Sequence, residues 1–373
     1  TSNGKSQSFR IKLLVYPFTL DKCDDYTFCM VYHLPQKNLQ RGVNGWNTLS
    51  RELRDMKEHG MNSVNFRPLV QNQWPELGEY RKTINVEGFT RLFESAKEAE
   101  LTHTIPLCLE IYLPYYLEKA KIDFQPEEWT YVKDALLKLQ SVCREKGLPD
   151  FYFYLDEPWM KERAYNYGKV FSYLKEYGLR NFCTVGKEEV YQALYPLLSV
   201  RCYGSRIGKQ AEIRAEAAKG DFEFWIYNGP TWSYIPAKSR FTIGYRTWWE
   251  GAKGHLVWDY AVFREKMPLN PLSNPNGVFA HEIIPDLAGP VPTTTWEAIR
   301  EGIDDIKYIR TLEKLIEKKR DAPEATAAQA YLNNLRIKIE VASQYEVEWN
   351  NPSTGEPLEG TPLWSSYQYN EIR

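Results

Sequence analysis

The stretch REKGLPDFYFYLDEPW, residues 144–159, contains in order the end of a helix, a glycine break, an apolar strand and two adjacent acids. The charged residues 144–146 end an amphipathic segment, and Gly147 suits the left-handed backbone conformation that terminates helices. The segment 151–155 is short, apolar and rich in aromatic residues, which is typical of a buried strand. The stretch therefore predicts a helix that leads directly into a core strand.

The same order of helix end, break and strand recurs along the chain. KEHG (57–60) precedes MNSVNF, KEYG (175–178) precedes LRNFCTV, and KEAE (97–100), without a glycine, precedes LTHTIPLCLE. Helices that alternate with short apolar strands indicate βαβ units and a parallel sheet. We predict eight strands, near residues 26–32, 62–66, 104–110, 150–155, 181–184, 198–202, 222–227 and 255–259.

A count of eight strands favours a closed barrel over an open doubly wound sheet. No GxGxxG or GxxxxGK[ST] motif follows the first strand, which disfavours a nucleotide-binding open sheet. The helix-to-strand joins are short, whereas the strand-to-helix segments are long and rich in proline and aromatics, as expected when the site lies at the strand carboxyl ends. We therefore predict an α/β protein, a (β/α)₈ TIM-like barrel with an N-terminal β extension and C-terminal helices.

Four regions follow from this pattern. Residues 1–20 include the strand-like FRIKLLVYPFT and form an N-terminal extension, and residues 21–293 form the catalytic barrel. Residues 294–346 read as two long helices packed on the outside of the barrel, and residues 347–373 read as an irregular tail. The chain begins Thr-Ser-Asn-Gly, without Met or a signal peptide, and we expect a processed or truncated product.

Composition limits the class of partner. The net charge is −2 with both signs interspersed, so nucleic acid and anionic membranes are not expected partners, and no run of 18 apolar residues is present. The six cysteines form no CxxC pair, and no histidine motif has metal-ligand spacing, so we expect neither a metal nor another cofactor.

Aromatic residues make up 14% of the chain, with 12 Trp and 26 Tyr. We expect about half of them in the core and the others along a surface or cleft, where flat rings can stack on the apolar faces of sugars.

The pair Asp156–Glu157 is the sharpest chemical signal, because it ends an aromatic strand abruptly. Carboxylates beside apolar rings are costly unless they are solvated, paired or used. One interpretation is structural, with the acids capping a helix or pairing with an arginine. The other is catalytic: neighbouring carboxylates address one side of a sugar, as in cleavage assisted by the substrate's own 2-acetamido group, with one orienting the acetamide and the other protonating the leaving oxygen.

Other strand ends supply candidate binding groups, because the carboxyl ends of all eight strands meet at one mouth of a barrel. Glu110 and Asp259 are rival carboxylates that also follow strands. The substrate-binding candidates are His33, Arg67, Tyr203, Tyr227 and Trp258.

Three stretches of the chain resemble glycoside hydrolase family 123. They are YLDEPW (154–159), RFTIGYRTWWEGAKGHLVWDYA (240–261) and WEAIREGIDDIKYIRTL (296–312), with weaker similarity from IKLLVYPFTL through LRDMKEHGMNSV. The resemblance implies a TIM-like barrel and a glycoside hydrolase that cleaves β-linked N-acetyl-hexosaminides, N-acetylgalactosaminides foremost, with retention and substrate assistance. It also implies that the strand at 11–18 is the last part of an upstream β-sandwich, and that the protein is secreted or periplasmic.

The resemblance further implies roles for single residues. Asp156 would position the acetamide and Glu157 would be the general acid/base. Tyr203 or Tyr227 would hydrogen-bond the acetamido oxygen, and Trp258 would form the floor of the sugar site. The alternative is a diverged barrel that binds glycan without cleaving it, or that hydrolyses sugars lacking an acetamido group; the sequence leaves sugar identity, linkage and oligomeric state open.

Overall fold

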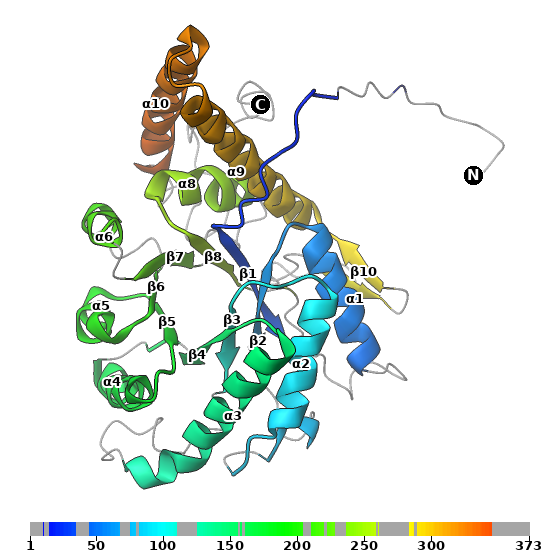
Figure 1. Cartoon of the computed structure of the whole chain (residues 1–373), viewed down its shortest axis with the longest axis vertical. Helices are drawn as coiled ribbons and strands as arrows, with labels where there is room; N and C mark the ends of the chain where they lie inside the picture. The colour runs from blue at the N-terminus through cyan, green and yellow to red at the C-terminus, as the bar shows by residue number, and fades with distance from the viewer. Residues whose placement is uncertain are drawn as a thin grey trace, which may run out of the picture.

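All eight predicted strands are present, and they form one closed parallel barrel in chain order (Figure 1). The last strand pairs with the first, so the predicted (β/α)₈ barrel is confirmed. The strands are β1 (Thr27–His33), β2 (Ser63–Arg67), β3 (Ile105–Cys108), β4 (Phe151–Leu155), β5 (Asn181–Val185), β6 (Val200–Tyr203), β7 (Glu223–Tyr227) and β8 (Gly254–Val257). The computed structural model describes residues 10, 15–34, 45–67, 75–79, 82–109, 125–155, 157–158, 161–203, 210–219, 222–227, 236–258, 260, 283–286 and 289–344.

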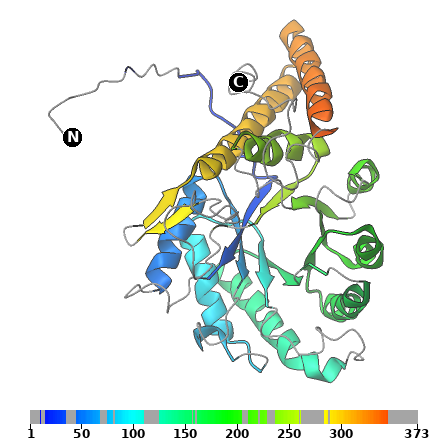
Figure 2. The ribbon, with the colours of Figure 1, turned by 180° about the vertical axis from the view of Figure 1, so that it is seen from behind.

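Helices surround the barrel on the outside, as Figures 1 and 2 show. Each of the strands β1 to β7 is followed by a helical segment, and the segment after β7 contains a π-helical stretch at Thr242–Arg246. A short antiparallel pair, β9 (Ile283–Asp286) and β10 (Gly289–Pro292), follows β8. The helices are α1 (Gly45–Glu58), α2 (Val86–Glu98), α3 (Thr130–Lys146), α4 (Lys161–Glu176), α5 (Glu188–Leu194), α6 (Gln210–Ala217), α7 (Pro236–Phe241), α8 (Thr247–Glu250), α9 (Thr294–Lys318) and α10 (Pro323–Gln344).

The helix ends follow the chemistry expected from the repeated pattern. Gly147 caps α3 in the left-handed region with φ 58°, and its N–H donates to the carbonyl of Arg144. Where the repeat lacks glycine, after α2, Glu100 takes the same left-handed conformation with φ 60°. A residue with a Cβ is strained there, so the turn geometry at this helix end is retained although its usual residue is absent.

In the barrel interior, aromatic side chains pack together with smaller apolar residues. Phe182 lies with its ring centroid 5.0 Å from that of Tyr154 and 5.3 Å from that of Trp225. Gly254 makes room for this packing, because a Cβ at that position would lie 2.4 Å from the Trp225 ring. A second and larger apolar cluster lies between the strands and the surrounding helices. Both faces of the strands are therefore buried, as parallel sheets require.

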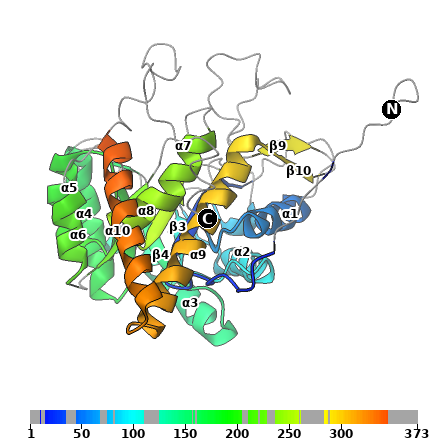
Figure 3. The ribbon, with the colours of Figure 1, turned by 90° about the horizontal axis from the view of Figure 1, so that it is seen from above.

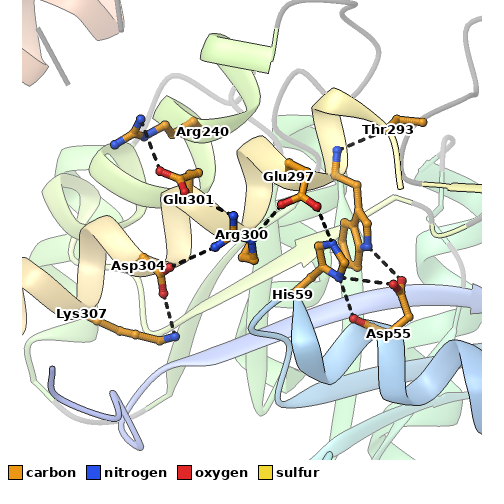
Figure 4. Close-up of polar contacts among 10 residues, drawn as sticks. Asp55, His59, Arg240, Thr293, Glu297, Arg300, Glu301, Asp304 and Lys307 are labelled. Carbon is orange, nitrogen blue, oxygen red and sulfur yellow. Dashed lines mark hydrogen bonds and ion pairs between the residues drawn. The ribbon is translucent and has the colours of Figure 1, made fainter. Parts of the chain in front are cut away.

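Helix α9 lies in the helical ring beside α7 (Figure 3), and polar contacts join it to its neighbours (Figure 4). On the side of α1, the indole N–H of Trp296 donates to the Oδ2 of Asp55 at 2.9 Å, and the ring of His59 stacks on that indole. On the side of α7, Arg240 donates two hydrogen bonds to Asp305, at 2.6 and 2.8 Å. These contacts join residues more than 60 positions apart in the sequence and attach α9 to both neighbours.

Two expectations for the chain ends have different outcomes. The two C-terminal helices are present as α9 and α10, so that prediction is confirmed. The expected N-terminal strand lies partly outside the described residues, and its part at residues 15–18 forms bends and irregular backbone. Among the described helices, none is long and apolar enough to cross a membrane.

Candidate functional site

Alternation along the strands decides which side chains face the barrel interior. On β2, Ser63, Asn65 and Arg67 share one face, while the intervening Val64 and Phe66 belong to the outer apolar cluster. By the same alternation, Tyr227 and Trp258 share the inward register of Trp225 and Leu256, and both pack against the interior cluster. The candidates at the ends of β2, β7 and β8 thus continue the inward face of the barrel.

His33, Arg67 and Trp258 form one group at the carboxyl ends of β8, β1 and β2, which we call the mouth cluster. His33 and Arg67 are partners in the β1–β2 register. The His33 ring meets the Trp258 ring edge-on with 5.1 Å between centroids, and the guanidinium carbon of Arg67 lies 5.0 Å from the Trp258 centroid. Arg67 is buried, whereas His33 and Trp258 are half-buried. The cluster therefore combines a cation, an imidazole and an accessible part of an indole at one point of the barrel mouth.

Glu157 follows β4 by two residues and is half-buried. Burial raises the pKa of Cys202 on β6 well above its ordinary value, and the negative charge of Glu157 contributes to that rise. The carboxylate of Glu157 therefore lies within electrostatic range of an inward-facing side chain two strands away. Glu157 thus approaches the barrel mouth from β4, while the mouth cluster is carried by β8, β1 and β2.

Of the remaining candidates, the structure describes the side chain of Tyr227 and the backbone of Tyr203. Tyr227 ends β7 and is half-buried against the interior cluster. Tyr203 ends β6, and only its backbone is described. The other predicted carboxylates, Glu110, Asp156 and Asp259, lie outside the described residues.

Asn65 is an inward-facing polar residue that sequence reasoning missed. Its side chain is fully buried, and neither of its amide atoms has a hydrogen-bond partner among the described residues. The alternation Ser-x-Asn-x-Arg in SVNFR was the available signal, because it places three polar residues on one face of a buried strand. Asn65 therefore lies between Ser63 and Arg67 on the inward-facing polar side of β2.

The inward-facing thiols of Cys29 and Cys202 are not suited to act as nucleophiles. Burial raises the pKa of Cys29 to about 12, and the pKa of Cys202 is raised well above its ordinary value, again chiefly by burial. Thiols with such pKa values stay protonated at neutral pH and are inert. All six cysteines are buried, and none of them is in a disulfide.

A cavity of about 600 Å³ lies at the opposite, amino-terminal end of the barrel. It is lined by His103, Asp150, Glu223 and Lys253, among others. There Tyr152 donates to Glu223 at 2.6 Å, and Arg180 pairs with Asp150 at 2.5 Å. In (β/α)₈ enzymes this end serves stability and the chemistry occurs at the other end, so the cavity is not the candidate active site.

Comparisons with known proteins give a fold relationship. No model of a known protein family matches the chain, and no curated protein matches it as a relative. Among solved structures, the chain is similar to a family 123 glycoside hydrolase from Clostridium perfringens, with a TM-score of 0.57 and 14% identity over 87% of this chain and 70% of that chain.

Two further solved structures are more distant. An exo-beta-1,4-mannosidase from Opitutaceae bacterium strain TAV5 has a TM-score of 0.48 and 13% identity over 76% of this chain and 60% of that chain. Native xylanase 10B from Thermotoga maritima has a TM-score of 0.45 and 12% identity over 78% and 98% of the two chains. At identities this low, the likeness to the Clostridium enzyme establishes a shared barrel fold and leaves the chemistry to be argued from the residues.

Proposed function

We propose that this protein is a glycoside hydrolase that binds its substrate sugar against the mouth cluster and uses Glu157 as general acid/base. The observation that carries the proposal is the convergence of His33, Arg67 and Trp258 at the barrel mouth. In this fold, residues at the carboxyl ends of the strands form the active site. The similarity in fold to a family 123 glycoside hydrolase supports the same class of reaction.

The mouth cluster has the chemistry that a sugar site needs. A half-buried indole offers an apolar face for the C–H face of a pyranose. The guanidinium of Arg67 and the ring nitrogens of His33 are hydrogen-bonding groups suited to sugar hydroxyls. These groups orient the sugar, and an acid from another strand must then deliver a proton to the glycosidic oxygen.

We assign that proton transfer to Glu157. In the first step the acetamido oxygen of the substrate attacks the anomeric carbon, the glycosidic C–O bond breaks, and Glu157 gives its proton to the leaving oxygen. In the second step Glu157 takes a proton from water as the water opens the cyclic intermediate, which restores the acid. Asp156 would hold the acetamido N–H during both steps. The proposed substrates are β-linked N-acetyl-hexosaminides, with N-acetylgalactosamine favoured by the resemblance of the YLDEPW segment and its two companion stretches to family 123.

The test is the turnover of an aryl β-N-acetylgalactosaminide by Glu157→Gln. Loss of a general acid/base removes about 10²- to 10⁴-fold of the rate, and we expect kcat to fall by that amount while binding of N-acetylgalactosamine stays measurable. The matched control is Glu223→Gln at the other end of the barrel, which we expect to keep full turnover because Glu223 contacts Tyr152 and Trp225 there.

Other outcomes separate the alternatives. A thiazoline that mimics the cyclised intermediate should inhibit the wild-type protein if the acetamide takes part. Activity on plain aryl hexosides with a dispensable Asp156 would favour a hydrolase of sugars without an acetamido group. Glycan binding without turnover of any aryl glycoside would favour a binding protein, and full activity of Glu157→Gln would reject the proposed role of this residue.

A further inference from the structure

Behind the mouth cluster lies a second pair of aromatic residues, Tyr32 and Tyr260. Tyr32 precedes His33 on β1 and faces the outer apolar cluster, and Tyr260 follows Trp258 by two residues. Their rings meet edge-on with 5.8 Å between centroids. The backbone N–H of Tyr260 also donates to the carbonyl of Val31 at 3.0 Å, so the chain after β8 stays bonded to β1.

Both tyrosine hydroxyls donate to carboxylates on one helix. Tyr32 donates to the Oε2 of Glu52, and Tyr260 donates to the Oδ2 of Asp55 at 2.8 Å. Glu52 and Asp55 are three residues apart on α1, a spacing that places both on the same face of the helix. We call Tyr32, Glu52, Asp55 and Tyr260 the tyrosine–carboxylate layer.

This layer is costly as a purely structural device. The exposed fractions of Glu52 and Asp55 are 5% and 8%, and burial raises the pKa of both carboxyls. Apolar residues of similar volume would fill such a space at equal or lower free energy. What the polar pairs add is direction, because a hydrogen bond fixes the end of each tyrosine ring at one point of α1, where apolar packing would allow the ring to slide.

The geometry points to a positioning role: we propose that Tyr32 and Tyr260 are positioning residues that set the spacing between the two rings of the mouth cluster. His33 is the next residue after one tyrosine, and Trp258 is two residues before the other. Anchoring both tyrosines on one face of α1 therefore fixes the ends of β1 and β8 relative to each other. The benefit of this arrangement for catalysis rests on the proposed function, whereas the positioning itself can be measured without turnover.

The experiment uses the full chain labelled with 5-fluorotryptophan and observed by ¹⁹F NMR. The resonance of Trp258 is identified by its loss in Trp258→Phe. We expect Tyr32→Phe and Tyr260→Phe each to shift or broaden this resonance, because the ring loses its anchor. In the same variants, KM for the aryl β-N-acetylgalactosaminide should rise roughly tenfold or more, with a smaller change in kcat, since misplacement of the binding wall weakens the alignment of the substrate.

The matched control is Tyr152→Phe. Tyr152 is also a buried tyrosine that donates to a carboxylate, at the amino-terminal end of the barrel. Its ring lies 6.1 Å from that of Trp225, so the control should move the Trp225 resonance and leave that of Trp258 in place. A conservative rescue follows from the chemistry: Glu52→Gln keeps an acceptor for Tyr32 and should preserve the Trp258 resonance, while Glu52→Leu should move it.

The outcomes are distinct. If the Trp258 resonance is unchanged in both tyrosine variants, or moves equally in Tyr152→Phe, the positioning role is wrong. If the wild-type protein turns over no aryl glycoside, the proposed function fails, and the fluorine spectra still decide the positioning role. Should Tyr32→Phe fail to fold, the test uses Tyr260→Phe together with the comparison of Glu52→Gln and Glu52→Leu.

Discussion

The two ends of the barrel use similar residues for different purposes. At the amino-terminal end, Arg180 pairs with Asp150 and lies over the ring of Tyr152, whose hydroxyl donates to Glu223. At the carboxyl end, the guanidinium of Arg67 lies over an indole that remains half-buried. Both ends thus contain an arginine over an aromatic ring.

The difference lies in what each aromatic ring is used for. Tyr152 is fully buried and directs its hydroxyl into a polar network at the amino-terminal end, so its ring is not available to a ligand. Trp258 keeps an accessible part at the mouth, where substrates reach (β/α)₈ enzymes. Position relative to the strand direction therefore separates a stabilising cluster from a candidate binding cluster.

The largest expected contrast is between Trp225→Ala and Trp258→Ala. Trp225 is fully buried among interior aromatics, so its truncation should cost about 3–5 kcal/mol of unfolding free energy. Trp258 is half-buried, and its truncation should cost roughly 1–2 kcal/mol. Urea denaturation measures both, and titration with N-acetylgalactosamine should show lost binding in Trp258→Ala. Equal stability losses, or sugar binding that survives in Trp258→Ala, would contradict the contrast between structural and binding aromatics.

The next effect concerns the pH dependence of stability through Glu52. Burial raises the pKa of its carboxyl from 4.5 to about 7. Between these two values the folded state holds a proton that the unfolded state has released, so the unfolding free energy falls as pH rises through this range, by about 3 kcal/mol in total. In Glu52→Gln this contribution is absent.

Denaturation of both proteins from pH 4 to 8 measures this effect. The unfolding free energy of Glu52→Gln relative to that of the wild type should increase with pH between about 4.5 and 7 and then level off. A pH-independent difference between the two proteins would show that Glu52 titrates normally. The Glu223→Gln variant serves as the control from the other end of the barrel.

The smallest effect is expected for Asp150→Asn. The side chains of Arg180 and Asp150 are 41% and 48% exposed, and exposed ion pairs contribute about 0–1 kcal/mol. The change in urea midpoint should be correspondingly small and should shrink further at high salt, because salt screens surface charges. A loss of several kcal/mol would mean that the amino-terminal network depends on this pair far more than its exposure indicates.

The local pattern was sufficient to predict the strands and several helix ends. Each predicted strand overlaps an observed one, because short apolar segments between helix ends and polar loops have one stable place in a parallel sheet. The end of α3 at Gly147 was also predictable, because the left-handed conformation that ends a helix favours glycine. The end of α2 shows the limit of this rule, with Glu100 in the position that glycine usually takes.

The candidate site was predictable only in part. The candidates at the ends of β1, β2 and β8 could be named from the sequence, because the carboxyl ends of the strands share one mouth. Asn65 lies within a strand and not at its end, so its only signal was the alternation of polar residues in SVNFR. The tyrosine–carboxylate layer was missed for another reason: Asp55 and Tyr260 are 205 positions apart, and no local pattern connects them.

The sequence by itself determined the alternation of helices and strands, the number of strands and the place of Glu157 just beyond an aromatic strand, because these depend on hydrophobic periodicity and on backbone preferences of neighbouring residues. Only the tertiary structure decided that Arg67 lies over Trp258, that the Trp225 ring packs where Gly254 has no Cβ, and that α1 anchors two tyrosines. The Arg67–Trp258 and Asp55–Tyr260 contacts depend on barrel closure, which brings β8 beside β1 and joins side chains more than 190 positions apart. The other contacts depend on the packing of neighbouring elements, which no local sequence pattern specifies.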